Sequence, residues 1–315
     1  MSKSGRLGVG IISAGKVGAV LGAALRAAGH AVLGVSAASH ASRERAEALL
    51  PGVPVLEVQQ IVERSELVLL AVPDDALPGL VDDLAKLGLW QPGQLVAHTS
   101  GRFGLGVLDA VRGVGADPVA LHPAMTFTGM SLDVTRLSDC SFGVTAGATV
   151  LPIAKALVVE MGGKPVAIAE ADRPLYHAAL THGSNHLLTL VGQASELLRD
   201  VGVEAPGQLL GPLLRATLEN ALASGESALT GPVARGDAGT VRAHVKALQE
   251  FDGGGQGVLA AYLAMALATA VRAGGRGLLK PDQLGHLRQA LELEEGGSCP
   301  PNPSALGRCS PAGSD

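Results

Sequence analysis

Aromatic side chains are scarce in this chain of 315 residues. Phenylalanine, tyrosine and tryptophan together make up 2% of it, whereas hydrophobic residues make up 47%. The core must therefore be built from alanine, valine and leucine, and such small side chains favour close packing of helices. The same scarcity weighs against a site for a large planar substrate.

Cysteine and basic clusters are scarce as well. The three cysteines, Cys140, Cys299 and Cys309, show no C-x-x-C spacing, so we expect a reducing compartment, no disulfide framework and no zinc site. Lysine and arginine number 24 against 29 acidic residues, for a net charge of −5. This balance disfavours nucleic acids and anionic membranes as partners.

Long hydrophobic runs of the kind that target or span membranes are missing too. The chain does not start with a charged leader and an apolar run of signal-peptide length. The longest apolar helical stretch, residues 257–271, is shorter than the roughly 20 residues that a transmembrane helix needs. We therefore expect a soluble, cytoplasmic protein.

Strand and helix patterns alternate in the first half of the chain. Short apolar runs predict strands at residues 7–12, 31–35, 53–55, 67–72, 95–97, 119–121, 142–145 and 165–168. Amphipathic runs predict helices at residues 17–28, 42–50, 77–87 and 152–161. This order is typical of an α/β fold with a doubly wound parallel sheet of the Rossmann type.

The second half is predicted to be all helical. Helices are expected at residues 173–201, 207–225, 239–250, 257–273 and 280–295, separated by glycine and proline. With a boundary near Glu170, we expect a dinucleotide-binding domain at 1–170 and a helical substrate and dimerisation domain at 171–295. Residues 296–315, rich in proline, glycine and serine, are predicted to be a disordered tail.

The most informative segment is residues 6–18, RLGVGIISAGKVG, in which an apolar strand runs into a glycine-bearing turn and a helix of small residues. Such a turn lets the backbone approach a pyrophosphate at the helix N-terminus. The Gly-x-Gly-x-x-Gly fingerprint is matched here by Ser13, Gly15 and Gly18, so serine replaces the glycine of the tight turn. We predict that the cofactor contacts Ser13, Ala14, Gly15, Lys16, Val17 and Gly18.

A phosphate-loop interpretation competes for the same segment, because Gly10 to Lys16 spells G-x-x-x-x-G-K. The next residue is Val17, so the hydroxyl that would hold Mg²⁺ is missing. Gly10 would also have to leave the predicted strand. We therefore prefer the dinucleotide-binding interpretation.

The end of the second strand indicates which nicotinamide cofactor binds. An acidic residue there would bind the ribose diol, and its absence with arginine nearby accommodates a 2′-phosphate. The strand runs into Ser36, and no acid appears before Glu44. We predict NADP(H), with Ser36 and Arg43 as the leading phosphate contacts. The competing interpretation is that Arg43 and Arg45 form a solvated helix face.

Three later strands end in residues that suit the chemistry of hydride transfer. Val72 and Pro73 end one strand, and we expect them beside the cofactor; the neighbouring Asp74 suits either this edge or a simple turn. His98 and Ser100 follow the next strand, and His122 follows the one after. An imidazole suits proton exchange near neutral pH. We predict His122 as the proton donor or acceptor and Ser100 as its orienting partner; a loop-stabilising role for the histidines is the alternative.

Polar residues interrupt the apolar pattern of the predicted helix 173–201. By helical spacing, His177, Thr181, Ser184 and Asn185 share one face, and we predict that Thr181 and Asn185 line the substrate cleft; helix–helix hydrogen bonding is the alternative. His182 and His186 have the spacing of a metal-binding pair, but no third ligand suggests itself and we predict no metal.

A loop at residues 230–237 precedes another helix. Asp237 is expected to be the N-cap of that helix. Arg235 has the geometry to bind a substrate carboxylate, although a role in the cap region is the simpler interpretation.

Together these segments resemble a family of bacterial Rossmann-like proteins whose C-terminal half is a domain of unknown function, the 2520 family. The resemblance is carried by IISAGKVG, LLAVPDDAL, HTSG, LHPAMTF, YHAALTHGSNHL and ALTGPVARGD. The layout is more distantly similar to pyrroline-5-carboxylate reductase, ketopantoate reductase and prephenate dehydrogenase. Prephenate dehydrogenases have a His-Pro-Met segment whose histidine contacts the reacting hydroxyl, which implies a similar role for His122. A serine accompanies it there, matched here by Ser100.

The sequence thus predicts an NADP(H)-dependent oxidoreductase acting on a small carbonyl, imine or hydroxy acid, and a homodimer formed through the helical domain. The alternative is a non-catalytic, NADP-binding sensor or partner-binding protein.

Overall fold

The computed structural model describes residues 6–251 and 255–292 and consists of two compact units, Met1–Asn185 and His186–Asp315. The division lies within one long helix, α8 (Arg173–Asp200). The predicted tail at 296–315 lies outside the described residues. The first unit carries a sheet, and we call it the sheet unit; the second is the helical unit.

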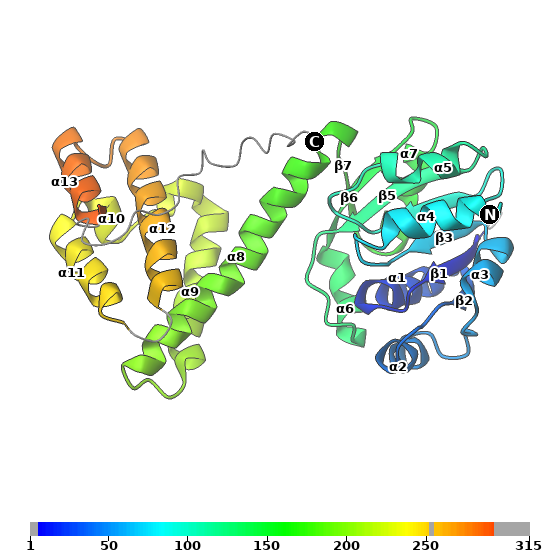
Figure 1. Cartoon of the computed structure of the whole chain (residues 1–315), viewed down its shortest axis with the longest axis horizontal. Coiled ribbons are helices and arrows are strands. Elements are labelled where there is room, and N and C mark those ends of the chain that lie inside the picture. The colour runs from blue at the N-terminus through cyan, green and yellow to red at the C-terminus, as the bar shows by residue number, and fades with distance from the viewer. Residues whose placement is uncertain (1–5, 252–254, 293–315) are drawn as a thin grey trace, which may run out of the picture. The chain divides into compact units, whose positions relative to one another are not determined.

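The sheet unit is built on seven strands in the order β2-β1-β3-β4-β5-β6-β7. The strands are β1 (Gly8–Ile12), β2 (Ala31–Val35), β3 (Leu67–Leu70), β4 (Leu95–His98), β5 (Asp117–Pro123), β6 (Ser141–Ala146) and β7 (Lys164–Ala167). The helices between them are α1 (Lys16–Ala27), α2 (His40–Leu49), α3 (Val58–Arg64), α4 (Leu77–Lys86), α5 (Asp109–Arg112), α6 (Ser131–Arg136) and α7 (Leu151–Glu160) (Figure 1). This arrangement confirms the predicted α/β fold.

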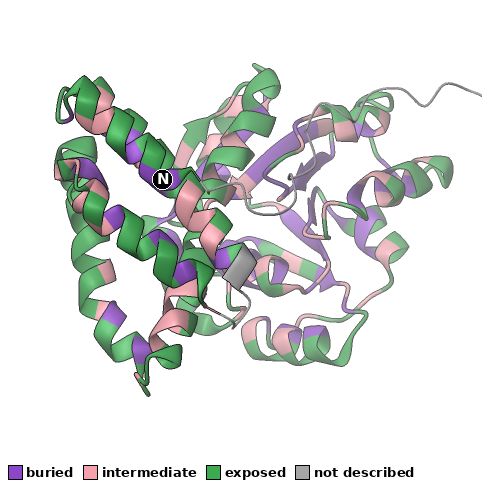
Figure 2. Cartoon of the chain, turned by 60° about the vertical axis from the view of Figure 1, so that its left-hand side comes forward, coloured by how far each residue is buried: buried purple, intermediate pink, exposed green. Residues whose placement is uncertain are grey.

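The central strands β1, β3 and β4 are buried along their whole length, and strands of the sheet are accordingly purple in Figure 2. Successive side chains of a strand point to opposite faces. Leu67 and Leu69 of β3 accordingly lie in one hydrophobic cluster with α1 and α7. Val68 and Leu70 lie in the other, with α3 and α4. Two cores thus hold the sheet and leave the strand ends to carry polar groups.

The sheet differs from the prediction at β6. This strand pairs antiparallel with β5, whereas all other pairs are parallel. A parallel return needs a crossover, usually through a full helix, but the β5–β6 connection contains only the six-residue α6 and one 3-10 turn. The chain therefore returns in the opposite direction.

Two further differences occur between β2 and β3. The predicted strand at 53–55 is reduced to one parallel bridge between Val35 and Val55. Helix α3, which was not predicted, follows it and buries Ile61 and Val62. Val58, Ile61 and Val62 have the spacing of one helical face, but the run is too short to stand out by periodicity.

The helical unit comprises the rest of α8 with α9 (Pro206–Ser224), α10 (Pro232–Arg235), α11 (Ala238–Gln249), α12 (Gly255–Gly275) and α13 (Pro281–Leu291). Val241, Ala270 and Leu287, from α11, α12 and α13, belong to its buried core. Asp237 caps α11 as predicted, accepting a 3.0 Å hydrogen bond from the Thr240 amide.

Helix α12 is apolar enough, by length and composition, to cross a membrane, with a mean hydropathy of 1.5 over Gly257–Gly275. The core helix of a soluble protein meets the same criterion. Here Ala266, Ala270 and Ala273 of α12 are buried in the core of the helical unit, so part of this apolar character serves the packing of α12 against its neighbours.

Candidate functional site

The turn after β1 forms as predicted and is held by β2. Ser13 has a φ of 82°, in the left-handed region that disfavours a side chain. Its amide donates a 2.8 Å hydrogen bond to the Ser36 hydroxyl, and the Ala14 amide donates at 2.7 Å to the Ser36 carbonyl. Ser36 therefore holds the strained turn in place from the end of β2.

The two glycines of the turn differ in what surrounds them. A Cβ on Gly18 would lie 2.1 Å from the Ser13 carbonyl oxygen, so α1 packs on the turn only with glycine there. A Cβ on Gly15 would meet no atom closer than the Ser13 hydroxyl oxygen, at 3.3 Å. Gly18 is therefore required for packing, whereas a Cβ on Gly15 would need only a small shift of the Ser13 hydroxyl.

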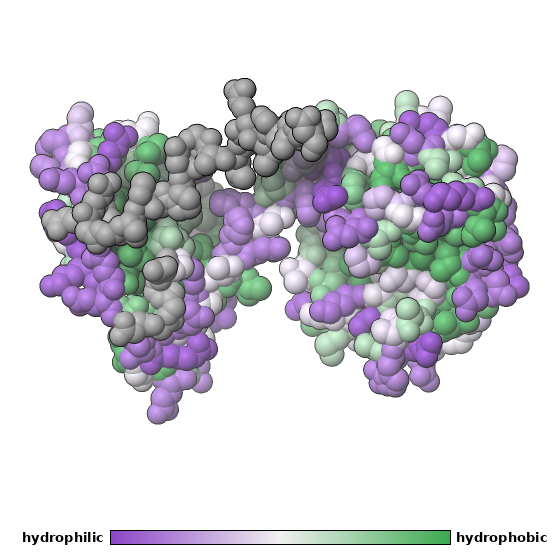
Figure 3. All heavy atoms as spheres, in the orientation of Figure 1, coloured by the Kyte–Doolittle hydropathy of each residue, from purple (hydrophilic) through white to green (hydrophobic). Residues whose placement is uncertain are grey.

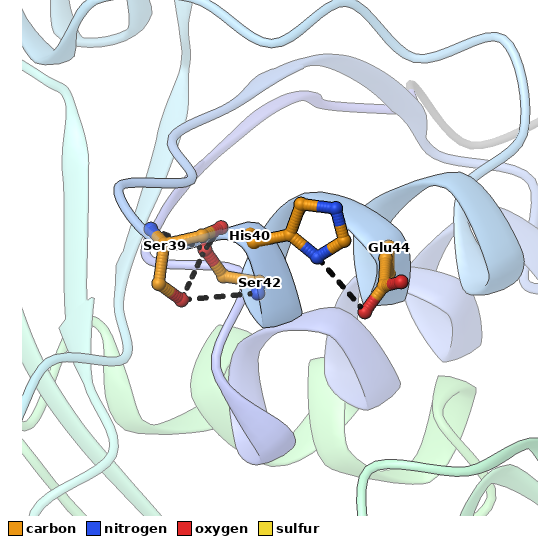
Figure 4. Close-up of polar contacts among 4 residues, drawn as sticks. All are labelled: Ser39, His40, Ser42 and Glu44. Atoms are coloured by element: carbon orange, nitrogen blue, oxygen red, sulfur yellow. Dashed lines mark hydrogen bonds and ion pairs between the residues drawn. The ribbon is translucent and has the colours of Figure 1, made fainter.

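The region predicted to hold a 2′-phosphate lies where β2 leads into α2 (Figure 4). Ser39 and Ser42 cap the helix by exchanging backbone and side-chain hydrogen bonds. His40 and Glu44 are exposed neighbours on this helix, with 3.4 Å between Nδ1 and Oε2. The first acid after β2 therefore lies beside a histidine on the helix surface.

The two arginines of α2 both donate to backbone carbonyls nearby. Nε of Arg43 lies 3.3 Å from the Ala37 oxygen. Nη1 of Arg45 lies 2.8 Å from the Ala14 oxygen, so Arg45 reaches back to the turn itself. Both arginines thus border the predicted phosphate region, and the solvated-face interpretation does not describe Arg45.

A hollow of about 450 Å³ opens along the carboxyl ends of β1, β3, β4 and β5. We call it the turn hollow. It brings together predicted residues from four separate segments. Its lining comprises Ser13, Gly15, Lys16, Val17, Ala71, Val72, Pro73, Asp74, Thr99, Ser100, Gly101, His122 and His177.

A second hollow, of about 300 Å³, lies against the first turns of α8, and we call it the helix hollow. The four polar residues predicted to share one face of that helix all line it. Its lining comprises His122, Pro123, Ala124, Met125, Thr126, His177, Leu180, Thr181, Ser184 and Asn185. His122 and His177 line both hollows, so the two imidazoles form their common wall.

His122 lies near the end of β5, and Tyr176 is its hydrogen-bond partner. Nδ1 of His122 is 2.9 Å from the Tyr176 hydroxyl oxygen, and the two rings meet edge to face at 88°. The His177 ring meets His122 in a second edge contact, with 5.9 Å between centroids. Tyr176 thus occupies Nδ1 of His122, and Nε2 is the ring nitrogen that could contact a ligand.

The pKa of His122 is lowered to about 4, first by burial and then by the positive charge of His177 and Arg173. The ring is therefore uncharged at neutral pH. The prediction of His122 as a proton-exchanging group assumed a pKa near neutrality, which this environment does not provide. A neutral imidazole still donates or accepts hydrogen bonds.

His98 is fully buried and uses both ring nitrogens inside its own loop. Nε2 lies 2.8 Å from the Gly104 oxygen, and Nδ1 accepts from the Ser100 amide at 3.2 Å. Burial lowers the pKa of His98 to about 4. These contacts support the loop-stabilising alternative for His98.

Ser100 was predicted to orient His122. Its hydroxyl accepts a 3.2 Å hydrogen bond from the Phe103 amide, and its carbonyl accepts from Arg173. The contact that holds the His122 ring comes instead from Tyr176. Ser100 nevertheless lines the turn hollow beside His122.

Arg173, the first residue of α8, is fully buried beneath the site. Its guanidinium donates to the Thr145 hydroxyl at 2.8 Å and to three backbone carbonyls, of Ser100, Ala120 and Gly143, at 2.9 to 3.3 Å. Among the described residues no carboxylate lies within ion-pair distance of it. It ties the ends of β4, β5 and β6 to α8.

Sequence reasoning gave no role to Tyr176 or Arg173. The available signal was their place at the start of a long helix in a protein with only two tyrosines. Their partners, however, lie 28 to 73 residues away along the chain. No local pattern identifies contacts of that range.

Two protein families match the chain in succession. Residues 2–123 match the Rossmann-like domain, and residues 140–269 match a domain of unknown function, DUF2520. These matches confirm the predicted resemblance. No curated protein matches the chain significantly.

Several solved structures share the fold. BF3122 from Bacteroides fragilis, which its name assigns to the NADP oxidoreductases, superposes with a TM-score of 0.71 at 18% identity, covering 84% of this chain and 98% of that one. A 1-pyrroline-5-carboxylate reductase from Streptococcus pyogenes superposes with a TM-score of 0.57 at 18% identity, covering 86% of this chain and 99% of that one. An imine reductase from Myxococcus stipitatus in complex with NADP+ superposes with a TM-score of 0.56 at 17% identity, covering 90% of this chain and 92% of that one. At these identities the likeness is one of fold.

Proposed function

We propose that this chain, which joins a Rossmann-like domain to a DUF2520 domain, is an NADP(H)-dependent oxidoreductase acting on a small carbonyl, imine or hydroxy acid. One observation carries the proposal: His122 and His177 line both the turn hollow and the helix hollow. A cofactor in the first and a substrate in the second would meet at these two rings. The names of the proteins that share the fold support this class of reaction.

The residues around the turn fit a dinucleotide. Gly15 lines the turn hollow and is the N-cap of α1, where the amides of the first helical turn and the helix dipole favour a pyrophosphate. When bound, NADPH supplies the hydride of the reaction. The residues that would hold the cofactor are Ser13, Ala14, Gly15, Lys16, Val17, Gly18, Ser36, Arg43, Val72 and Pro73.

A preference for NADP(H) over NAD(H) follows from the end of β2. No carboxylate precedes Glu44 there, and Nδ1 of His40 lies 3.4 Å from Oε2 of Glu44. Arg43 lies on the exposed side of α2, where its guanidinium would meet a 2′-phosphate. An imine reductase with the same fold is described in complex with NADP+.

The substrate would lie in the helix hollow among polar groups. Thr181, Ser184 and Asn185 offer hydroxyl and amide groups to a substrate, and no lysine, arginine, aspartate or glutamate lines this hollow. In this assignment His122 contacts the reacting carbonyl, imine or hydroxyl. Thr181 and Asn185 orient the substrate, and Ser100 shapes the loop beside His122.

Fluorescence titration with NADPH and NADH tests the cofactor assignment. We expect tighter binding of NADPH, and a loss of that preference in Arg43→Ala. Arg64→Ala is the matched control, because Arg64 is exposed and ends α3 just before the amino end of β3, at the opposite edge of the sheet. Equal binding of both cofactors by the native protein would contradict the assignment.

Oxidation of NADPH in the presence of small ketones, keto acids and cyclic imines tests the activity. We expect turnover of at least one class, and its loss in His122→Asn and Asn185→Ala with NADPH binding retained. If NADPH binds but none of these compounds is reduced, the result favours the non-catalytic sensor or partner-binding protein.

We further propose that the protein is a cytoplasmic homodimer joined through the helical unit. Leu188 of α8 and Leu222 of α9 are 76% and 79% exposed, and Leu213 of α9 is 59% exposed. Apolar atoms also appear at the surface of this unit in Figure 3. Exposed leucines favour association with another surface, and a second copy of the chain would cover them.

A further inference from the structure

The contact between Tyr176 and His122 joins two elements that are distant in sequence. Tyr176 lies in the first turn of α8, and His122 lies near the end of β5, 54 residues earlier. The phenol oxygen is 2.9 Å from Nδ1, and the ring centroids are 5.6 Å apart. A bond of this length needs one hydrogen, carried either by the phenol or by Nδ1.

The surroundings of the phenol oxygen indicate which group carries that hydrogen. Gly143 pairs with His122 across the sheet, and a Cβ there would lie 2.5 Å from the Tyr176 oxygen. Burial raises the pKa of Tyr176, while the charge of Arg173 and the backbone of Gly143 lower it by less. With its pKa raised, the phenol keeps its hydrogen at neutral pH and has it to donate to Nδ1. The phenol is also the stronger donor and the imidazole nitrogen the stronger acceptor.

We infer that Tyr176 donates its hydroxyl hydrogen to Nδ1 of His122 and so fixes the ring as the tautomer with its hydrogen on Nε2. A neutral imidazole has one donor and one acceptor nitrogen, so an accepting Nδ1 requires a protonated Nε2. Tyr176 is in this sense a positioning residue, acting through His122. Only the catalytic consequence drawn below rests on the proposed function.

The charges around His122 keep the ring neutral, as the inference requires. His177 and Arg173 of α8 and His98 of β4 disfavour a proton on His122, and Asp74 after β3 favours one. Burial outweighs all of these and places the pKa at about 4. The neutral ring, with its two tautomers, is therefore the form present at neutral pH.

The protonated Nε2 faces the loop that lines the turn hollow. A Cβ on Gly101 would lie 2.9 Å from Nε2 of His122, so only glycine leaves room beside this nitrogen. An N–H at this place donates to a group that offers a lone pair. Under the proposed function, that group is the carbonyl oxygen or imine nitrogen of a substrate that is about to be reduced.

The chain contains its own control for this inference. His244 of α11 and Tyr262 of α12 form a second pair, with 3.0 Å between Nδ1 and the phenol oxygen and an 80° angle between the rings. That pair belongs to the helical unit, and its hydrogen bond is exposed. Water replaces an exposed hydrogen bond at little cost, so removing the Tyr262 hydroxyl should change the stability of the protein little.

Long-range ¹H–¹⁵N NMR of the labelled full-length protein tests the tautomer without any assay of activity. His122→Asn identifies the signals of His122 by their disappearance. At neutral pH we expect Nδ1 of His122 to resonate as an unprotonated nitrogen and Nε2 as a protonated one. A protonated Nδ1, or two nitrogens averaged between both states, would overturn the inference.

Tyr176→Phe then tests whether the Tyr176 hydroxyl is what fixes the tautomer of His122. Phenylalanine retains the ring packed over Gly143 and removes only the hydroxyl. We expect the two His122 nitrogens to move toward an average of both tautomers, while Tyr262→Phe leaves them where they are. Unchanged His122 signals in a Tyr176→Phe protein of native melting temperature would show that Tyr176 does not set the tautomer.

Kinetics separate this inference from the proposed function. If the protein reduces substrates, Tyr176→Phe should lower kcat by about tenfold or more and leave the affinity for NADPH unchanged. If the NMR result holds but no substrate is reduced, the tautomer assignment stands and the oxidoreductase proposal fails. If the NMR result fails while reduction occurs, only the role of Tyr176 is wrong.

Discussion

The two units of this protein differ in the groups that matter most for the proposals made above. The sheet unit buries Arg173 and His98 completely and gives each hydrogen-bond partners from its own chain. The helical unit instead leaves Leu188 and Leu222 more than three-quarters exposed. The buried polar groups belong to the candidate site of the sheet unit, whereas the exposed leucines of the helical unit are the surface that the proposed dimer would cover.

The largest effect is expected from removing the buried guanidinium of the sheet unit. Arg173→Met would leave the Thr145 hydroxyl and three carbonyls without their donor, which we expect to cost about 3–5 kcal/mol in the free energy of unfolding. Urea denaturation measures this cost. Arg112→Met is the control, because Arg112 forms an exposed pair with Asp109 and should change stability by less than about 0.5 kcal/mol. Equal effects of the two variants would remove the contrast between buried and exposed arginines.

Acid should weaken the sheet unit next most strongly, through His98. The pKa of His98 is about 4 in the folded protein, against about 6.5 in the unfolded chain. Between these values the unfolded state binds more protons, so the free energy of unfolding falls as the pH is lowered through this window. A full shift corresponds to about 3 kcal/mol.

Denaturation at a series of pH values checks this loss. We expect His98→Asn to reduce the pH dependence and leave the part contributed by His122, whose pKa is also about 4, whereas replacing the exposed His40 by asparagine should leave the slope unaltered. A native protein whose stability did not decrease toward pH 4 would contradict the buried, neutral state of His98.

Crowding at the glycine turn should have a smaller effect. Gly18→Ala forces a Cβ against the Ser13 carbonyl oxygen, 2.1 Å away, and should cost about 1–3 kcal/mol. Gly79→Ala is the matched control within helix α4, where no atom lies within 4 Å of the added Cβ. It should be neutral or stabilise the protein by up to about 1 kcal/mol. Thermal unfolding of both variants separates the cost of the steric clash at position 18 from the effect of alanine on helix propensity.

The smallest change in unfolding free energy is expected on the exposed face of the helical unit. Leu222→Glu should alter it by no more than about 0.5 kcal/mol, yet reduce the mass seen by sedimentation from dimer toward monomer. Leu87→Glu, at a leucine of the sheet unit that is 58% exposed, should leave the mass unchanged. A native protein that sediments as a monomer would refute the proposed dimer.

Much of the fold could be predicted from the chain because its signals are local. The run from β1 through Ser13 and Gly18 into α1 lies within one short segment, and so does the cap that Asp237 provides for α11. Helix α3 was missed because its apolar spacing extends over only seven residues. The direction of β6 was also wrong, since it depends on how residues 124–140 return to the sheet and not on the pattern of the strand itself.

The site was predicted in part. Residues at the ends of parallel strands gather at one edge of the sheet, and this rule brought Ser13, Pro73 and His122 together around the turn hollow. The helical spacing of Thr181 and Asn185 likewise placed them in one hollow. What the rule does not provide is which atom of each side chain meets which partner.

By itself the sequence determined the alternation of strands and helices, the glycine turn and the polar face of α8, because each depends on residues close together in the chain. Only the tertiary structure decided that Tyr176 holds Nδ1 of His122 and that Arg173 lies buried under the same site. It also decided that the pKa of His122 falls to about 4. Burial and hydrogen bonding between distant segments set these properties, and they arise only once the folded chain has excluded water from the site.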